Sequence, residues 1–571
     1  MNVSHSFSSR RSVRILLAVC LPAIAFLSFR LLDTSAADKG AAPKHGLIVA
    51  VSPPGADVGR DILLKGGNAV DAAVATAFAM AVTYPAAGNI GGGGFMVVHP
   101  GKGAEPLVFE FRETAPAAAA KTMYAKNESW YTHKCVGVPG TVRGMELAHK
   151  KFGKLPWKDV VLPAVKLAEE GFVINDSLAS SLNSGVGGSG NPEMARVLGK
   201  EGAAGWSGGD RLVQKDLAKT LRLIAEGGAD AFYTGPVADL IVAEMKSGNG
   251  LITKDDLAKY AAKERKPIHG TFRGFDVYGP PPPSSGGICL VEMLNILENF
   301  DLKKQGRWSP ETLHVIIETM RRVYCDRARH LGDQDFVKIP EHLTSKEYAK
   351  KLADGIDRTK ATKSEDLAKD IPITGEGDST THFSVIDNDG MAVSMTYTLE
   401  RSYGSGIVVK GAGFLLNNEM IDFNWYPGVT DRGGNIGTEA NQIAPGKRML
   451  SSQTPTIVAK NGKVVLITGS PGSRTIINTS MQVVLNVLEF DMSVQEAVDA
   501  PRLHHQWLPD RARFEGVYDK KLAEAVAKLK AMGHIVTGTR QGDAHTIWVD
   551  PKTGTYHGAA DKRMDGKVSG F

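Results

Sequence analysis

Thr380 and the residues around it could form a nucleophile that activates itself. The segment Asp-Ser-Thr-Thr-His from Asp378 joins a polar stretch to a strand-like run that begins with hydroxyl side chains. A threonine at a free N-terminus can act without a separate base, because its own α-amine, with a pKa of about 7.7–8.0, accepts the proton of its Oγ. That amine forms only when the Ser379–Thr380 bond is cut, and the same hydroxyl can attack the preceding carbonyl. The pattern therefore predicts a self-cleaving precursor, although Thr-Thr-His alone would indicate only the start of a polar strand.

Two other patterns could carry chemistry, but each is better explained by structure. The glycine run from Gly91 to Gly94 lacks the Gly-Lys-Ser/Thr that completes a phosphate-binding loop. It favours a tight turn with a close backbone approach instead. His504 and His505 are adjacent, which does not suit two metal ligands on one face of an element. We therefore expect a structural role for these two histidines.

The elements around Thr380 follow from alternation and turn signals. Residues 381–387 and 391–398 alternate in polarity on either side of Asn-Asp-Gly, which predicts a β-hairpin. The charged and polar residues 360–378 predict an exposed loop before it. Strands in runs and helices in separate blocks indicate stacked sheets with helical layers rather than a parallel dinucleotide-binding sheet. The other predicted elements are strands at 95–98, 109–112, 456–459 and 464–468, and helices at 68–82, 290–298, 310–329 and 475–488.

Composition sets the class of protein and excludes some partners. The 571 residues are 42% hydrophobic and 23% charged, which is ordinary for a globular protein. The net charge of +5 comes from dispersed residues without a basic tract, so no nucleic-acid partner is expected. Cys135, Cys289 and Cys325 are too few for a disulfide framework and are predicted to be buried apolar residues.

The N-terminal residues have the pattern of a secretory signal peptide. Arg10, Arg11 and Arg14 precede an apolar run over residues 15–29, and small side chains follow at 34–37. The apolar run is short for a membrane span of about 20 residues. We therefore expect an exported protein, periplasmic or extracellular. An uncleaved segment that tethers the protein to the membrane is the alternative.

Many ordered motifs give the chain a family resemblance. After residue 379 they are Thr-Thr-His-Phe-Ser-Val from Thr380, Gly-Phe-Leu-Leu-Asn-Asn-Glu-Met from Gly413 and Ala-Pro-Arg-Leu-His-His-Gln-Trp from Ala500. Before it are Gly-Gly-Asn-Ala-Val-Asp-Ala-Ala from Gly66 and Phe-Arg-Glu-Thr-Ala-Pro from Phe111. In these motifs the chain resembles the gamma-glutamyltransferase family of N-terminal-nucleophile hydrolases.

The resemblance implies a fold, a maturation and an activity. The fold is α+β, a four-layer αββα sandwich formed jointly by two chains cut from one precursor. The boundaries would be a signal peptide at 1–36, a large chain at 37–379 and a small catalytic chain at 380–571, which stay together as a heterodimer. The expected activity transfers the γ-glutamyl group of glutathione and related compounds to water, amino acids or peptides through an acyl-threonine. No metal or organic cofactor is implied.

The resemblance also assigns roles to ten residues. Read alone, most of them would be ordinary surface ion pairs, solvated acids or loop serines. Thr380 would be the nucleophile, and Thr398 would hydrogen-bond it. The donor's α-carboxylate would bind Arg112, Ser451 and Ser452, and its α-ammonium would bind Glu400, Glu419 and Asp422. The N–H groups of Gly472 and Ser473 would form the oxyanion hole.

Three departures from the family pattern concern selectivity rather than chemistry. Glu400 stands where relatives have an asparagine, so it crowds three acids together. Ser473 replaces the second glycine of Gly-Ser-Pro-Gly-Gly, and the lid loop at 430–449 lacks the tyrosine of some relatives, with Gly433 near its place.

A sister acylase acting on glutaryl amides or on poly-γ-glutamate is the closest alternative, and an unprocessed, inactive binding protein is another. Glu419 and Asp422 favour a donor with an α-amine, and intact Thr380 and Thr398 favour an active enzyme.

Overall fold

A computed structural model describes residues 43–202, 205–368, 371 and 381–571. The predicted signal peptide and Thr380 lie outside these ranges. Among the helices described, none has both the length and the apolar character needed to cross a membrane.

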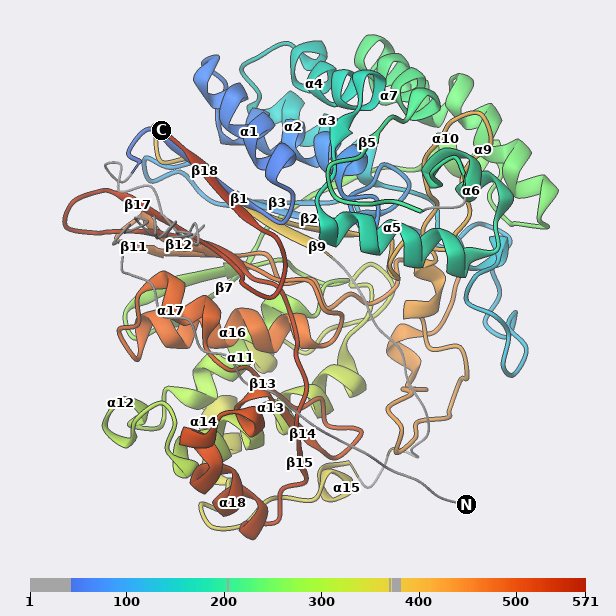
Figure 1. Cartoon of the computed structure of the whole chain (residues 1–571). Coiled ribbons are helices and arrows are strands. Elements are labelled where there is room, and N and C mark those ends of the chain that lie inside the picture. Colours follow the sequence, from blue (N-terminus) through green and yellow to red (C-terminus); the bar gives the residue numbers. More distant parts are fainter. Residues whose placement is uncertain (1–42, 203–204, 369–370, 372–380) are drawn as a thin grey trace, which may run out of the picture. The chain divides into compact units, whose positions relative to one another are not determined.

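The first of the two large antiparallel sheets has seven strands, and strands from before and after position 380 are interleaved in it (Figure 1). Its centre is the predicted hairpin, in which Thr381 pairs with Tyr397 and Ile386 pairs with Ala392. Gly390 closes the hairpin turn with a φ of +79°, a conformation that favours glycine. The strand order is β18 (Lys567–Gly570), β1 (Gly46–Ala50), β9 (Thr381–Asp387), β10 (Ala392–Thr398), β2 (Gly93–His99), β3 (Leu107–Glu110) and β6 (Lys263–Arg265).

The second sheet has six antiparallel strands and packs face to face on the first. Phe95 and Val97 of β2 meet Ile457 and Ile467 in a layer of buried apolar side chains between the sheets. Burial of such side chains is the main favourable contribution to folding. The strand order is β17 (Tyr556–Ala560), β16 (His545–Val549), β12 (Lys463–Thr468), β11 (Thr456–Lys460), β8 (Phe275–Gly279) and β7 (Ile268–Phe272).

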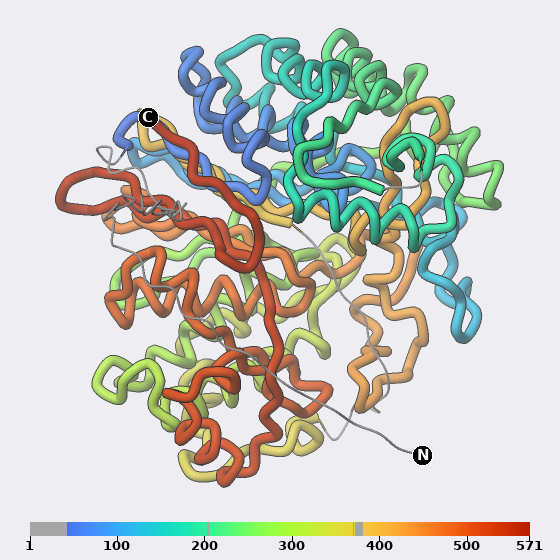
Figure 2. The backbone as a smooth tube through the Cα atoms, viewed as in Figure 1, coloured from blue at the N-terminus to red at the C-terminus, as the bar shows by residue number. Residues whose placement is uncertain are grey.

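Helices cover the outer face of each sheet, which confirms the predicted αββα order of layers. Figure 2 shows the blue, cyan and green helices of the N-terminal part on one side of the paired sheets and the yellow-green, orange and red helices on the other. On the first sheet lie α1 (Pro53–Leu64), α2 (Ala69–Thr83) and α3 (Thr141–Phe152), with α4 (Trp157–Glu170) and α7 (Lys215–Gly227) behind them. On the second lie α11 (Gly286–Leu297), α16 (Thr475–Leu488) and α17 (Val494–Asp499), with α13 (Pro310–His330) packed on α11.

Local sequence explains how two of these helices begin. Asn68 caps α2 in a capping box with Asp71, and every residue of this alanine-rich helix is buried. The predicted helix at 475–488 is confirmed as α16. It follows a turn in which Gly472 and Ser473 have φ of +120° and +50°. A non-glycine residue at positive φ is uncommon and marks a constrained turn.

The glycine run and the loop before position 380 differ in how well the sequence predicts them. A Cβ atom added to Gly92 would lie 1.9 Å from the carbonyl oxygen of Thr398, so the close backbone approach is confirmed. The prediction of an exposed loop from residue 360 is wrong for residues 364–367, which form the short helix α15 (Ser364–Leu367). Glu365 and Asp366 are exposed as expected, but Ser364 is fully buried, and Trp507 Nε1 donates to its carbonyl at 2.8 Å. Cys135, Cys289 and Cys325 are buried, as predicted.

Candidate active site

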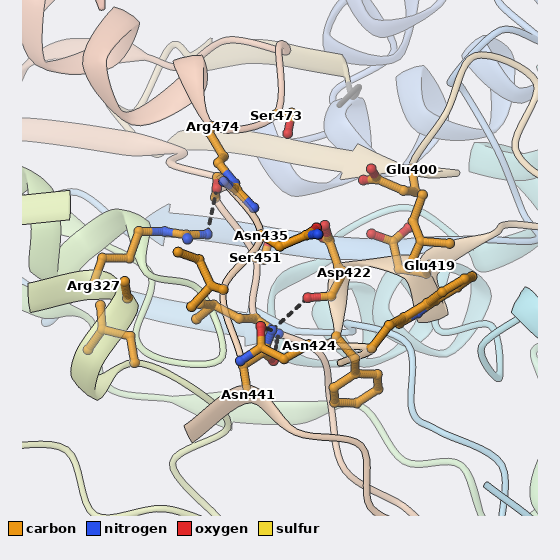
Figure 3. A pocket seen from close by; sticks show the side chains of 18 of the residues that line it. Arg327, Glu400, Glu419, Asp422, Asn424, Asn435, Asn441, Ser451, Ser473 and Arg474 are labelled. Carbon is orange, nitrogen blue, oxygen red and sulfur yellow. Dashed lines mark hydrogen bonds between the residues drawn. The ribbon is translucent and has the colours of Figure 1, made fainter. Parts of the chain in front are cut away.

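A polar pocket of about 340 Å³ gathers seven of the ten predicted site residues (Figure 3). They come from distant parts of the chain: the loop after β3, the end of β10, the short 3₁₀ helix Glu419–Asp422, the segment after the predicted lid loop and the turn before α16. The fold thus brings them together across more than 300 positions of sequence. The seven are Arg112, Glu400, Glu419, Asp422, Ser451, Ser452 and Ser473.

The other three predicted residues are adjacent to the pocket or outside the description. Thr398 is the last residue of β10, and its Oγ1 accepts a hydrogen bond from the N–H of Glu400 at 2.7 Å. Gly472 directly precedes Ser473 and does not itself line the pocket. Thr380 lies outside the described residues. The last pair of the β9–β10 register joins Thr381 to Tyr397, so Thr398 is the next residue on β10.

Arg112 is the buried cation at one end of the pocket. Its side chain is 1% exposed and pairs with Glu419 and Asp422, while Glu113 lies 3.6 Å away. Its backbone carbonyl accepts hydrogen bonds from Tyr260 at 2.8 Å and Arg448 at 3.2 Å, which fix the loop after β3. The guanidinium is therefore held rigidly with its planar fork towards the acids.

More acids surround Arg112 than one cation can neutralise. The carboxylate oxygens of Glu400, Glu419 and Asp422 lie within 4.8 Å of one another. Burial raises the pKa of Glu419 well above its usual range, and the neighbouring acids add to the rise while Arg112 opposes it. Burial raises the pKa of Glu113 in the same way. Among the described residues, Glu419 Oε2 and both oxygens of Glu113 have no hydrogen-bond partner. This side of the pocket is suited to a bound cation.

The two predicted serines are held in place by residues of the large predicted chain. The Ser451 carbonyl accepts from the N–H and the hydroxyl of Ser285, at 2.7 and 2.6 Å. Ser452 Oγ accepts from Arg327 Nη2 at 2.9 Å. The Pro-Pro-Pro-Ser-Ser-Gly-Gly segment from Pro281, which contains Ser285, thus supports the serine pair.

The turn at Gly472 and Ser473 presents unused hydrogen-bond donors at the start of α16. The Gly472 carbonyl accepts from the N–H of Thr475 at 3.0 Å, and that of Ser473 from Ile476 at 3.0 Å. Within the described part of the chain, neither Gly472 N–H nor Ser473 N–H has an acceptor. Two such donors at a helix N-terminus are suited to a developing oxyanion.

Sequence reasoning missed five charged residues at or beside this site: Glu113, Glu128, Arg327, Arg401 and Arg474. Glu113 directly follows Arg112, and Arg474 directly follows Ser473, so proximity to predicted residues was the available signal. Arg327 had no such signal, because α13 brings it in from the large predicted chain. The predicted lid loop borders the pocket through Asn435, Thr438 and Asn441.

Comparison with known proteins agrees with this geometry. Residues 55–571 match the profile of the Gamma-glutamyltranspeptidase family. The chain belongs to this family. It is 46% identical over 542 residues to a glutathione hydrolase proenzyme of Escherichia coli, covering 92% of each chain.

Solved structures place the fold among the N-terminal-nucleophile hydrolases. A cephalosporin acylase from Bacillus halodurans superposes with a TM-score of 0.80 at 27% identity, over 93% of this chain and 96% of that chain. A gamma-glutamyltranspeptidase chain from Helicobacter pylori gives a TM-score of 0.53 at 43% identity, over 54% of this chain and 91% of that chain. The predicted family and fold are confirmed, and the protein is an enzyme of this family.

Proposed function

We propose that this enzyme transfers the γ-glutamyl group of glutathione and related γ-glutamyl compounds to water, amino acids or peptides. The observation that carries the proposal is the pairing of a buried arginine with an excess of acids in one pocket. A γ-glutamyl group ends in an α-carboxylate and an α-ammonium, and these are the two charges that such a pocket can bind. The 46% identity to a glutathione hydrolase proenzyme supports the same substrate class.

Maturation cuts the Ser379–Thr380 bond. The Thr380 hydroxyl attacks the preceding carbonyl, and hydrolysis of the resulting ester leaves chains 37–379 and 380–571. Each sheet contains strands of both chains, and in the seven-stranded sheet they are interleaved, which supports a permanent heterodimer. The small chain then begins with Thr380, directly before β9.

Acyl transfer proceeds in two steps. Thr380 Oγ attacks the γ-carbonyl carbon of the donor and passes its proton to the Thr380 α-amine. The carbonyl oxygen becomes an oxyanion held by the N–H groups of Gly472 and Ser473. Collapse breaks the C–N bond, and the α-amine returns the proton to the leaving amine. Water or an acceptor amine then attacks the acyl ester by the same route. Thr398, next on β10, hydrogen-bonds the nucleophile.

Donor binding replaces an internal ion pair with the charges of the substrate. The α-carboxylate pairs with the guanidinium of Arg112 and accepts hydrogen bonds from the hydroxyls of Ser451 and Ser452. The α-ammonium binds Glu419 and Asp422, which Arg112 then no longer contacts, together with Glu400. Arg112 and the acids that it releases thus keep opposite charges beside them, which avoids the cost of isolating a buried charge.

Secretion follows from the sequence pattern of residues 1–36. We place the mature enzyme in the periplasm or outside the cell, tethered to the membrane only if that segment is not removed.

An acylase that removes glutaryl groups is the second candidate, favoured by the similarity to the cephalosporin acylase. A glutaryl group carries the carboxylate but no α-ammonium. A bound glutaryl group would place no positive charge beside Glu419 and Asp422, so a γ-glutamyl donor fits the pocket better.

The nucleophile is tested with Thr380→Ala and Thr380→Ser. On a denaturing gel we expect two bands for the wild type and one uncut band for Thr380→Ala. Release of nitroaniline from γ-glutamyl p-nitroanilide should be lost in Thr380→Ala and retained in part in Thr380→Ser, which keeps a hydroxyl. Two bands or full activity in Thr380→Ala would overturn the assignment.

A further inference from the structure

Two of the four arginines that line the pocket have no acidic partner among the residues that the structure describes. Arg112 pairs with Glu419 and Asp422, and Arg401 stacks on Trp130 at 4.7 Å. For Arg327 and Arg474, no carboxylate of the described chain lies within ion-pair distance. Figure 3 shows both guanidinium groups pointing into the pocket from the side opposite Glu400 and Glu419. The pocket is therefore divided into an acidic half and a basic half.

Arg327 is a buried cation with only neutral partners. It is 8% exposed, and its Nε and Nη2 donate to the hydroxyls of Ser285 and Ser452 at 2.8 and 2.9 Å. Burial lowers the pKa of Arg327, and the nearby charge of Arg474 lowers it further. A buried charge is costly unless an opposite charge compensates it. A bound anion would supply that compensation.

Arg474 extends the positive region towards the reacting bond. It stands at the N-cap of α16, a helix of 14 residues whose N-terminus adds partial positive charge. Its Nη1 donates to the carbonyl of Gly434 at 2.7 Å. Asp431, an acid on the same loop as Gly434, accepts hydrogen bonds from the N–H groups of Gly434 and Asn435, at 3.0 and 3.2 Å. Arg474 is thus held beside the proposed oxyanion hole without a neutralising charge.

We propose that Arg474, with Arg327 beside it, binds the carboxylate of the amine that leaves the donor or enters as acceptor. This inference rests on the proposed function, in which Arg112 and the acids already take both charges of the γ-glutamyl group. An anion at Arg474 therefore belongs to the other part of the substrate, on the far side of the bond that breaks. Leaving and entering amines occupy the same place in a two-step transfer. The enzyme thus selects γ-glutamyl peptides with a free C-terminal carboxylate over neutral γ-glutamyl amides.

The test compares glutathione with its C-terminal carboxamide, two donors that differ only in that charge. For the wild type we expect kcat/KM for glutathione to exceed that for the amide by about 10-fold or more, as for a hydrogen-bonded charge pair. In Arg474→Gln the ratio should fall to near one, and Arg474→Lys should restore part of it. Because the two donors are compared within each variant, a general loss of activity affects both kcat/KM values and cancels in their ratio. Such a loss could follow from breaking the hydrogen bond of Arg474 to Gly434.

Arg513→Gln is the matched control. Arg513 carries the same charge on the nearby strand β14 (Ala512–Phe514), does not line the pocket, and donates to Gln506 at 3.4 Å. It should keep the wild-type ratio. A wild-type ratio near one, or a ratio that Arg474→Gln leaves unchanged, would overturn the inference. The proposed function would still stand if the enzyme releases nitroaniline from γ-glutamyl p-nitroanilide. Absence of turnover with every γ-glutamyl compound would overturn the proposed function as well.

Discussion

Two buried charged clusters in this protein differ in how completely their atoms are paired. The pocket cluster, made of Arg112, Glu113, Glu400, Glu419 and Asp422, has one cation against four acids and leaves three carboxylate oxygens without a hydrogen-bond partner among the described residues. The histidine network, made of His314, Glu318, Arg321, His505, Asp510 and His534, leaves no buried side-chain atom of these six residues unpaired. Both are buried, so burial alone does not distinguish a binding site from a structural contact.

The histidine network satisfies each ring nitrogen of its central histidines. His314 Nε2 donates to the carbonyl of Asp357 at 2.7 Å, so its Nδ1 accepts from His534 Nε2 at 2.7 Å. His534 Nδ1 in turn accepts from Arg321 at 3.4 Å. Burial lowers the pKa of His534 to about 3, which keeps the ring neutral. The network therefore needs no further ligand.

The carboxylates of the network are paired as fully. Glu318 faces Arg321 at 3.2 Å and Arg322 at 2.6 Å. Asp510 accepts from Ser364 N–H at 2.8 Å and pairs with Arg321. His314, Glu318 and His534 are close enough to hold a metal ion, but their ligand atoms already have protein partners. Since Ser364 precedes position 380 and Asp510 follows it, the network joins the two predicted chains.

The comparison predicts that breaking the network costs stability, and this is the largest effect we expect. Arg321→Ala removes a side chain that is 2% exposed and leaves Glu318 and Asp510 short of a counter-charge. We expect the free energy of unfolding to fall by about 3–5 kcal/mol, measured by denaturant unfolding. The kcat/KM of the folded protein should change little. As a control, Arg432→Ala breaks an ion pair whose arginine is 81% exposed and should leave stability unchanged.

Breaking the pocket cluster should instead cost activity. Asp422→Asn removes one charge that we assign to the donor's α-ammonium, so kcat/KM for γ-glutamyl p-nitroanilide should fall by about 10- to 100-fold. Glu128→Gln is the matched control, because Glu128 also lines the pocket but is already paired with Lys134 at 2.6 Å. An equal loss of kcat/KM in both variants would show that only the total negative charge of the pocket matters, which would contradict our assignment of Asp422.

The smallest predicted effect is on pH dependence. Burial raises the pKa of Glu113 and of Glu419, so these acids retain a proton below the raised values. Because the substrate ammonium requires ionised acids, KM should fall as pH rises through the raised pKa, by up to about tenfold per pKa unit. In Glu113→Gln this change should be smaller. A KM that does not change with pH in the wild type would contradict our assignment of these acids to the substrate's ammonium.

The same acids should lower stability as the pH rises. Their folded pKa lies above the unfolded value of about 4.3, so the folded state binds protons more strongly in that window. The free energy of unfolding should therefore decrease between the unfolded pKa and the raised folded pKa. Glu113→Gln should weaken this dependence, measured by denaturant unfolding at pH 5 and pH 8.

Sequence patterns predicted the local elements well, since each depends on neighbouring residues. The hairpin of β9 and β10, the helix α16 and the buried helix α2 all follow from alternation, turn residues and apolar periodicity. The site could not be derived in this way, because Arg112 and Glu419 are 307 positions apart and meet only in the folded chain. The resemblance supplied that pairing.

What the sequence did not reveal depends on tertiary packing. Arg327 enters the pocket only because α13 packs on α11, and no local signal separates it from the other arginines of that helix. Ser364 was assigned to an exposed loop from its polar surroundings, whereas contacts with Trp507 and Asp510 from the other predicted chain bury it. Both cases involve partners more than 100 positions away.

Our central claim is that the unpaired acids of the pocket select donors that carry an α-ammonium. The most direct test compares nitroaniline release from γ-glutamyl and glutaryl p-nitroanilides, which differ only in that group. We predict a higher kcat/KM for the γ-glutamyl compound, with the preference reduced in Asp422→Asn. A preference for the glutaryl compound would contradict the account and make this enzyme an acylase.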